Sequence, residues 1–500
     1  MNWLRFGWGR TRSRPTAPRE PWPLDLPLFQ WTQDEPFTLE EACKGLQIWG
    51  MTGSGKSSAS GRLVALSYLQ QGFGGLVLCA KPDEAETWRN YCRRAGRSDQ
   101  LIVFSPASSW RFNFLDYELQ RPGAGAGQTE NILRLFMTIA EIASRGTGGG
   151  GDGREDEGYW KRSLQQLLRN TIDLLVIATG RVSAPDLYKI VVSAPTSLDQ
   201  TGSASWQEKS FCWACLQRGD AASKSGYHAH DFQLVADYFL LEYPGLSEKT
   251  RSVIVSTFTS MIDVLNRGAL RELFCATTNV TPEDILAGKI VVVDLPVKEF
   301  AEVGQFAAVL WKYLFQRAVE RRDVRANPRP CFLFVDESQL FTTGFDALFQ
   351  TTARSSRCCT VYLTQNLNNY LSAYKGPSGE ADARSLLGNL TTHVVHALAD
   401  SDTAQFVAEL IGRRQLFLNA SVSHDAYHPV GDLLGRRPGQ QSGGFSESFE
   451  YDLQPAELFR MKTGGRANDF QVQALVWRGG SPFPSTRRSY LWTSFDQRRI

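Results

Sequence analysis

Short apolar runs alternate with amphipathic segments in two parts of the chain, before residue 121 and after residue 284. Helical periodicity follows several of these runs, for example near Glu84–Ala95, Val303–Arg321 and Thr403–Gly412. Strands of a parallel sheet read as continuous apolar runs, because helices cover both faces of such a sheet. The pattern predicts an α/β fold with a mostly parallel sheet, whose strands are Leu46–Trp49, Gly75–Ala80, Leu101–Phe104, Lys289–Leu295, Cys331–Glu337, Cys359–Leu363 and Thr392–Ala397.

The middle of the chain has a different pattern, with helical periodicity and few strand signals. Apolar positions share one face within residues 132–136 and again within 164–175, and the glycine-rich segment Gly146–Gly158 between them reads as a loop. Ser197–Ser210 and Leu434–Ser448 also read as connections, because both are rich in small and polar residues. We therefore expect an arm at 1–35, a first α/β part at 36–120, an all-α insert at 121–284, and a second α/β part at 285–500.

A glycine-rich loop follows the first predicted strand and leads into a predicted helix. Its sequence fits G-x-x-x-x-G-K-[ST], with Gly50, Gly55, Lys56 and Ser57 in the required places and an extra Gly53. Glycines let successive N–H groups point at phosphate oxygens, while the helix start adds free N–H groups and a positive dipole end. The lysine can reach the β- and γ-phosphates, and the serine hydroxyl can ligate Mg²⁺.

A Gly/Ser loop with a stray lysine is the alternative reading of this loop. The strand before it and the apolar helix after it favour the phosphate loop. The residues predicted to hold ATP and Mg²⁺ are Gly50, Thr52, Gly53, Ser54, Gly55, Lys56, Ser57 and Ser58.

Two later strands are predicted to end in polar side chains at the same edge of the sheet. The run Cys331–Glu337 ends in Asp336 and Glu337, and the next strand is followed by Gln365. Ligands of open α/β sheets bind at the carboxyl ends of the strands. Asp336 is therefore predicted to hold Mg²⁺, and Glu337 to polarise the attacking water. Gln365 can detect the γ-phosphate, although a plain strand-end cap is the alternative.

Two arginines, Arg354 and Arg357, precede that strand, and we expect them near the nucleotide edge of the sheet. One of them can reach across a subunit boundary and neutralise charge in the transition state. A solvated basic turn is the alternative, and the local sequence does not decide between the two.

Composition limits the partners that the protein can have. A net charge of +2 over 500 residues means that any nucleic-acid surface must be a local patch. No run of about eighteen apolar residues exists, so no transmembrane helix is predicted. Arginines and aromatics alternate before residue 15, which favours peripheral contact with a membrane or with nucleic acid, or else a disordered tail.

The nine cysteines are scattered, which indicates a reducing compartment. Cys212 and Cys215 form a lone C-x-x-C, and the spacing of the histidines after it favours ordinary thiols over a zinc site. His393 and His396 are an odd number of positions apart on a predicted strand, so their rings point to opposite faces and do not form a metal pair.

The order of these motifs resembles that of the type IV coupling proteins of bacterial conjugation (TraG/TraD-type), within the FtsK/HerA-like DNA translocases. The resemblance rests on Tyr159-Trp160, Thr250-Arg251-Ser252, Gly288-Lys289, Ala353-Arg354-Ser355 and Asp400-Ser401-Asp402-Thr403-Ala404, together with the phosphate-loop motif and the Asp-Glu pair. It implies a RecA-like P-loop NTPase core interrupted by an all-α domain. It also implies a hexameric ring around DNA, with Lys56, Glu337, Gln365 and a trans-acting Arg354 in the ATPase centre.

The chain departs from that family pattern in two places. Family members usually begin with two transmembrane helices, which are not found here, and the D-P-K-G after the second strand appears as Ala80-Lys81-Pro82-Asp83. The resemblance implies a cytoplasmic ATPase, peripheral to the cell membrane, that pumps DNA or nucleoprotein to a secretion channel, with a relaxase and channel proteins as partners. The alternatives are a ring ATPase of DNA processing or antiphage defence, and an ATP-gated docking receptor for protein substrates.

Overall fold

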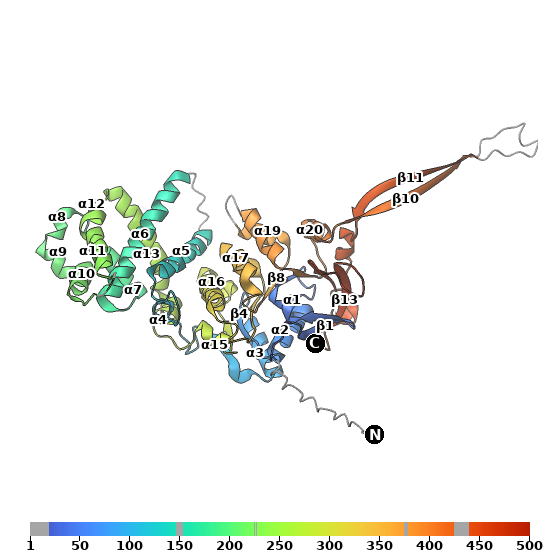
Figure 1. Cartoon of the computed structure of the whole chain (residues 1–500), viewed down its shortest axis with the longest axis horizontal. Coiled ribbons are helices and arrows are strands. Elements are labelled where there is room, and N and C mark those ends of the chain that lie inside the picture. The colour runs from blue at the N-terminus through green and yellow to red at the C-terminus, as the bar shows by residue number, and fades with distance from the viewer. Residues whose placement is uncertain (1–19, 147–153, 225, 227, 375–378, 425–439) are drawn as a thin grey trace, which may run out of the picture.

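A computed structural model describes residues 20–146, 154–224, 226, 228–374, 379–424 and 440–500. Within these residues, a nine-stranded sheet forms the centre of the molecule, in the order β13-β12-β9-β3-β8-β7-β4-β6-β5 (Figure 1). The strands from β9 to β5 in that order run parallel, while β12 is antiparallel to both β9 and β13. The strand bounds are β3 Leu46–Trp49, β4 Gly74–Leu78, β5 Leu101–Phe104, β6 Ile290–Val293, β7 Cys331–Val335, β8 Cys358–Thr364, β9 Thr392–Val395, β12 Gln471–Arg478 and β13 Tyr490–Asp496.

These strands confirm the predicted mostly parallel α/β sheet, with bounds that differ by a residue or two. The inner strands are buried along their whole length, so consecutive residues contribute to cores on opposite faces. Ile48 packs in the core that holds β1, α1, α2 and α3, whereas Trp49 packs in the core that holds α16 to α19. The helices over the two faces are α1 Leu39–Cys43, α2 Arg62–Gln70 and α3 Glu84–Arg94 on one, and α16 Val297–Arg321, α17 Gly344–Ala353, α18 Leu367–Ala373 and α19 Gly379–Asn389 on the other.

Register places three strand ends side by side. Trp49 of β3 is opposite Thr364 of β8, and Val335 of β7 is opposite Tyr362 of β8. Strand β8 therefore lies between the strand that leads into the glycine-rich loop and the strand that leads into Asp336 and Glu337. Residues that follow these three strands meet at one edge of the sheet.

A helical part lies to one side of the sheet (Figure 1). Its long helix α6 packs against α7, α10, α11 and α13, and its apolar side chains join the sheet core around α16 in one continuous cluster. The segment 197–210, predicted as a connection, contains two short helices, α8 and α9. The bounds are α4 Phe114–Gln120, α5 Thr129–Gly146, α6 Arg154–Thr179, α7 Ala184–Ser193, α8 Leu198–Thr201, α9 Ala204–Lys209, α10 Phe211–Ala221, α11 His228–Asp237, α12 Tyr243–Gly245, α13 Glu248–Leu265, α14 Gly268–Phe274 and α15 Pro282–Leu286.

The end of the predicted N-terminal arm is part of the folded core. Strand β1 (Pro27–Thr32) pairs with β2 (Glu35–Thr38), and Trp31 is buried against Phe37 and Phe495. The prediction that the arm extends to residue 35 is therefore wrong, because apolar side chains between the prolines anchor it. Residues 1–19 lie outside the described part of the chain.

A two-stranded hairpin replaces part of a predicted loop near the C-terminus. Strand β10 (Arg413–His424) pairs antiparallel with β11 (Gln440–Tyr451), and the pair projects away from the sheet after α20 (Ser401–Ile411) (Figure 1). The prediction of a loop is wrong over 440–448, because backbone pairing forms a hairpin without an apolar pattern. Residues 434–439 lie outside the described part of the chain.

Among the helices of the described residues, none combines the length and the apolar character that crossing a bilayer requires.

Candidate nucleotide-binding site

The glycine-rich loop between β3 and α2 has a backbone that only glycine adopts easily. Gly53 and Gly55 have φ of 79° and 88°, and a Cβ on Gly55 would lie 2.8 Å from both γ-carbons of Val472. The N–H groups of Gly50 and Met51 donate to the carbonyls of Thr364 and Ala397, which ties the loop to the sheet edge. The loop is therefore held open by its glycines and anchored at its start.

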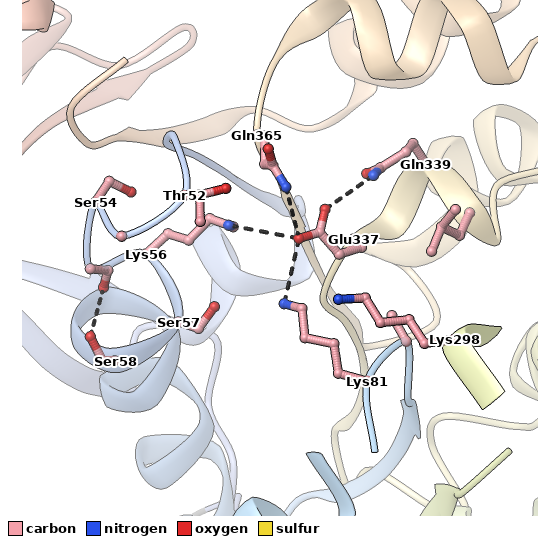
Figure 2. A pocket seen from close by; sticks show the side chains of 14 residues that line it. Thr52, Ser54, Lys56, Ser57, Ser58, Lys81, Lys298, Glu337, Gln339 and Gln365 are labelled. Carbon is pink, nitrogen blue, oxygen red and sulfur yellow. Dashed lines mark hydrogen bonds and ion pairs between the residues drawn. The ribbon is translucent and has the colours of Figure 1, made fainter. Parts of the chain in front are cut away.

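A cavity of about 470 Å³ lies against this loop (Figure 2). Lys56 precedes a π-helical turn, Ser57–Gly61, which continues into α2, so the helix start faces the cavity. The residues around the cavity are Thr52, Gly53, Ser54, Gly55, Lys56, Ser57, Ser58, Ala80, Lys81, Lys298, Glu337, Gln339, Leu340 and Gln365. Most of the residues predicted to bind nucleotide therefore share one cavity, while Gly50 supports the loop from behind.

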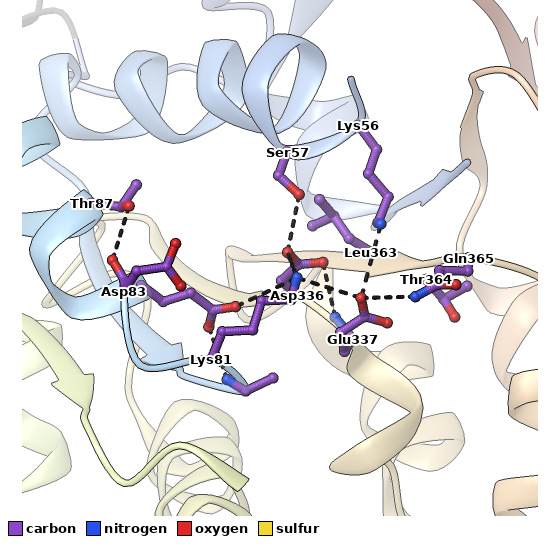
Figure 3. A network of polar contacts seen from close by, with 12 residues as sticks. Lys56, Ser57, Lys81, Asp83, Thr87, Asp336, Glu337, Leu363, Thr364 and Gln365 are labelled. Carbon is purple, nitrogen blue, oxygen red and sulfur yellow. Dashed lines mark hydrogen bonds and ion pairs between the residues drawn. The ribbon is translucent and has the colours of Figure 1, made fainter. Parts of the chain in front are cut away.

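Asp336 and Glu337 follow β7, which β8 separates from β3, and they face the loop across the end of β8 (Figure 3). Ser57 Oγ donates a hydrogen bond of 3.0 Å to Asp336 Oδ2, and Lys56 Nζ lies 3.9 Å from Glu337 Oε1. The Gln365 amide donates to the same Glu337 oxygen at 3.2 Å. The structure thus brings together five side chains that were predicted from separate parts of the sequence.

The oxygens of this group fit a magnesium ion. Mg²⁺ prefers hard oxygen ligands, and the Ser57 hydroxyl and the Asp336 carboxylate converge at the mouth of the phosphate loop. Ser54 Oγ is buried in the loop, and within the described residues it has no hydrogen-bond partner. That hydroxyl lies against the position that a Cβ on Gly50 would take, so a larger residue at position 50 would displace it.

The carboxyl groups in and beside the cavity differ in protonation, because burial and neighbouring charges shift their pKa values in opposite directions. Burial raises the pKa of Glu337, but the hydrogen bond from Gln339 and the charge of Lys56 outweigh burial, so its pKa is lowered. Burial beside Asp336 raises the pKa of Glu84 to about 8. Glu337 is therefore an anion at neutral pH, ready to accept a hydrogen bond from water, whereas Glu84 is mostly protonated.

Sequence analysis missed three polar residues that line this cavity, Lys81, Lys298 and Gln339, and also Glu84, which lies outside the cavity with its carboxylate 4.0 Å from Lys81 Nζ. Partial burial lowers the pKa of Lys81, but the charge of Asp336 and a hydrogen bond to it outweigh burial and raise the pKa. Lys81 follows β4, which pairs with β7, so the rule that polar residues at carboxyl strand ends meet would have identified it.

The expected position of Arg354 and Arg357 near the nucleotide edge is wrong. Both residues precede β8, whereas Gln365 follows it, so the length of the strand, about 20 Å, separates them from the cavity of their own chain. Arg357 is tied to the carbonyls of Trp22 and Pro328. Arg354 is half exposed and pairs with Glu40 at 2.8 Å.

His393 is buried on β9 and His396 is buried directly after it, and they have separate partners, so the prediction that they face opposite ways is confirmed. His393 contacts the Trp49 indole, and His396 contacts the Ser60 hydroxyl. Cys212 and Cys215 are buried in α10, where burial raises the pKa of both thiols, that of Cys215 to about 11.

Comparisons with known proteins agree with this architecture. A sequence model of the family described as "TraM recognition site of TraD and TraG" matches residues 330–462, which include Asp336, Glu337, Arg354 and Gln365. No curated protein matches the chain.

Several solved structures share the whole fold. The unbound bacterial conjugative coupling protein TrwB, without its first 70 residues, matches with a TM-score of 0.56 and 15% identity over 97% of this chain and 92% of its own. The plasmid coupling protein TrwB in complex with ADP and Mg²⁺ matches with a TM-score of 0.53 and 15% identity over 92% and 87%. Its complex with the non-hydrolysable ATP analogue ADPNP matches with a TM-score of 0.54 and 14% identity over 93% and 89%. The chain therefore has the TrwB-like fold of the TraG/TraD coupling proteins.

Proposed function

We propose that this protein is a P-loop ATPase that couples ATP hydrolysis to the movement of DNA toward a conjugative secretion channel. The observation that supports it most directly is the convergence of Ser57 with Asp336, and of Lys56 with Glu337 and Gln365, at one sheet edge. TrwB, whose fold this chain shares, has been solved with ADP and Mg²⁺ and with an ATP analogue.

The side chains of this edge suit nucleotide hydrolysis. Gly50 to Ser58 would wrap the phosphates, with Lys56 at the β- and γ-phosphates. Ser57 and Asp336 would hold Mg²⁺, which supplies charge neutralisation when bound. Glu337, kept anionic and oriented by Gln365 and Gln339, would position the attacking water and accept its proton.

A ring of identical subunits would complete the site. Arg354 is exposed and is remote from its own cavity, so it can act only in the site of a neighbouring copy. Six copies around a central channel would let hydrolysis at each interface move a bound strand. We expect sequence-tolerant, salt-sensitive DNA binding at the cytoplasmic face of the membrane, with a relaxase and channel proteins as partners.

A docking role is the second candidate, and the family match favours it. The matched family is described as a recognition site for TraM, so the exposed residues within 330–462 are a candidate surface for a protein partner. In that case nucleotide binding would control assembly, and hydrolysis would not be needed for transfer.

The decisive experiment measures ATP hydrolysis and particle symmetry together, with single- or double-stranded DNA added to the purified chain. We expect DNA-stimulated hydrolysis by ring-shaped particles, and loss of hydrolysis in Glu337→Gln with ATP binding retained. A chain that stays monomeric with nucleotide and DNA and hydrolyses no ATP contradicts the proposal. A Glu337→Gln protein that assembles and still supports transfer favours the docking role.

A further inference from the structure

The inference concerns Lys81, and it rests on the proposed nucleotide site. Lys81 Nζ lies 3.1 Å from Asp336 Oδ2 and 3.4 Å from Glu337 Oε1 (Figure 3). The same Asp336 oxygen accepts the hydrogen bond from Ser57 Oγ. Lys81 therefore occupies one of the two oxygens through which Asp336 would ligate a metal ion.

The position of Lys81 allows it to move. Its side chain is 30% exposed, and it extends from the loop after β4 toward the cavity (Figure 2). Four methylene groups separate its charge from the backbone, so the ammonium can turn without moving the loop. Lys298, in the first turn of α16, lines the same cavity, and its backbone N–H donates to the carbonyl of Ala80, the residue before Lys81.

The two carboxylates of the cavity require a cation beside them both with and without bound nucleotide. Asp336 and Glu337 are adjacent and mostly buried, and two carboxylates in such a place are costly without a counter-ion. Lys81 contacts both carboxylates and is the lysine that pairs with Asp336, whereas Lys56 pairs with Glu337 at 3.9 Å. A divalent cation bound to Asp336 would repel the ammonium, whereas the phosphates that enter with it would attract the ammonium.

We propose that Lys81 is an exchangeable cation of the nucleotide site. It neutralises Asp336 and Glu337 before nucleotide binds, competes with the divalent cation for Asp336, and then turns to contact the phosphates. Lys81 is thus a phosphate-binding residue in addition to Lys56, and the cost of displacing it makes metal binding depend on the presence of nucleotide.

The first test titrates the nucleotide-free protein with Mn²⁺ and measures free Mn²⁺ by electron paramagnetic resonance. Lys81→Met removes the competing charge, so it is expected to bind Mn²⁺ at least about threefold more tightly than wild type. Lys298→Met removes the same charge from the same cavity, but no contact between Lys298 and Asp336 is found in the described residues. It is therefore expected to change Mn²⁺ affinity less than Lys81→Met does. Equal effects of the two variants overturn the proposal.

The second test measures binding of a fluorescent ATP analogue in the presence of EDTA. Lys81→Met is expected to weaken binding at least about threefold, while Lys81→Arg, which keeps the charge, retains most of it. Unchanged binding by folded Lys81→Met overturns the proposal, as does unchanged Mn²⁺ affinity. Thermal unfolding checks the fold, and Lys81→Gln replaces the methionine variant if that variant misfolds. A wild-type chain that binds no nucleotide contradicts the proposed function instead.

Discussion

Ser57 and Asp336 stand 279 positions apart in the chain, yet Ser57 Oγ donates a hydrogen bond of 3.0 Å to Asp336 Oδ2. Strand β8 separates the two strands that carry them, and each residue lies just beyond the carboxyl end of its own strand or loop. The glycine-rich loop and the acidic pair therefore belong to one site. Ser57 Oγ and Asp336 Oδ2 lie close enough to bind the same ion.

Removing the Ser57 hydroxyl is expected to weaken Mg²⁺-dependent nucleotide binding. Ser57→Ala takes away one oxygen ligand and leaves the loop backbone unchanged, so the Mg²⁺ concentration for half-maximal nucleotide binding should rise at least about tenfold. Titration of a fluorescent ATP analogue with Mg²⁺ measures this. Ser57→Thr keeps the hydroxyl and serves as the matched control. Equal Mg²⁺ dependence of wild type and Ser57→Ala would show that Ser57 does not bind the ion.

Arg354 is expected to act on a neighbouring subunit. Arg354→Ala should lower ATP hydrolysis at least about a hundredfold while nucleotide binding persists, because the cation that neutralises the transition state is lost. Mixing Arg354→Ala with Lys56→Ala subunits should restore part of the activity, since some interfaces then combine an intact loop with an intact arginine. Steady-state hydrolysis of the mixtures measures this.

A control for this prediction is available on α19. Arg384 is exposed and carries one ion pair, with Glu380 at 2.9 Å, like the pair between Arg354 and Glu40. Arg384→Ala should hydrolyse ATP at the wild-type rate. No recovery in the mixtures, with assembly intact, would argue against action across the interface.

The contribution of His393 to stability is expected to fall below pH 6.5. Trp49 Nε1 donates to His393 Nδ1, so Nε2 carries the proton donated to the Leu390 carbonyl, and the ring is neutral. Burial lowers its pKa to about 4, whereas an unfolded histidine titrates near 6.5. Between these values the unfolded chain binds a proton at His393 that the folded chain does not, so the stability that His393 contributes decreases as the pH falls from 6.5 to 4.

The loss from this residue is on the order of 3 kcal/mol at pH 4 and vanishes above pH 7. Melting temperatures of wild type and His393→Asn, compared at pH 7.5 and pH 5, measure it. The variant should lose less stability on acidification than wild type does. Parallel losses in the two proteins would mean that His393 does not titrate in this range.

The buried ion pair of Lys312 with Asp346 is expected to stabilise the contact between α16 and α17. Both side chains are almost fully buried, and Asp346 also accepts hydrogen bonds from Gln316 and Tyr362. Burial raises the pKa of Asp346, but the charge of Lys312 outweighs burial and lowers it. Lys312→Met leaves a buried carboxylate without its cation, at a cost of about 3–5 kcal/mol.

Chemical unfolding of Lys312→Met, and of the double variant with Asp346→Asn, measures this cost. The double variant should recover part of the loss, because the uncompensated charge is gone. Lys189→Met is the control, since its pair with Asp186 is exposed and should contribute less than about 1 kcal/mol. A Lys312→Met protein as stable as Lys189→Met would contradict the prediction.

Local patterns were sufficient to predict the seven parallel strands of the sheet and the glycine-rich loop. Continuous apolar runs such as Cys331–Val335 are strands that are buried on both faces, so the run of apolar residues is visible in the sequence itself. The hairpin of β10 and β11 has no apolar pattern that would predict it, because its serines, glycines and glutamines pair through their backbone. The burial of Trp31 likewise could not be predicted from its neighbours in the sequence, because it depends on contacts with Phe37 and Phe495.

The chain by itself determined which residue types the site would have: a glycine loop with Lys56 and Ser57, an acidic pair, and Gln365 after a strand. Each of these needs only a strand and the residues next to it. Only the tertiary structure decided that Lys81 lies on Asp336, and that Arg354 lies at the far end of β8 from its own cavity. The order of strands in the sheet sets those distances, and strand order follows from packing between segments hundreds of residues apart, which no local pattern records.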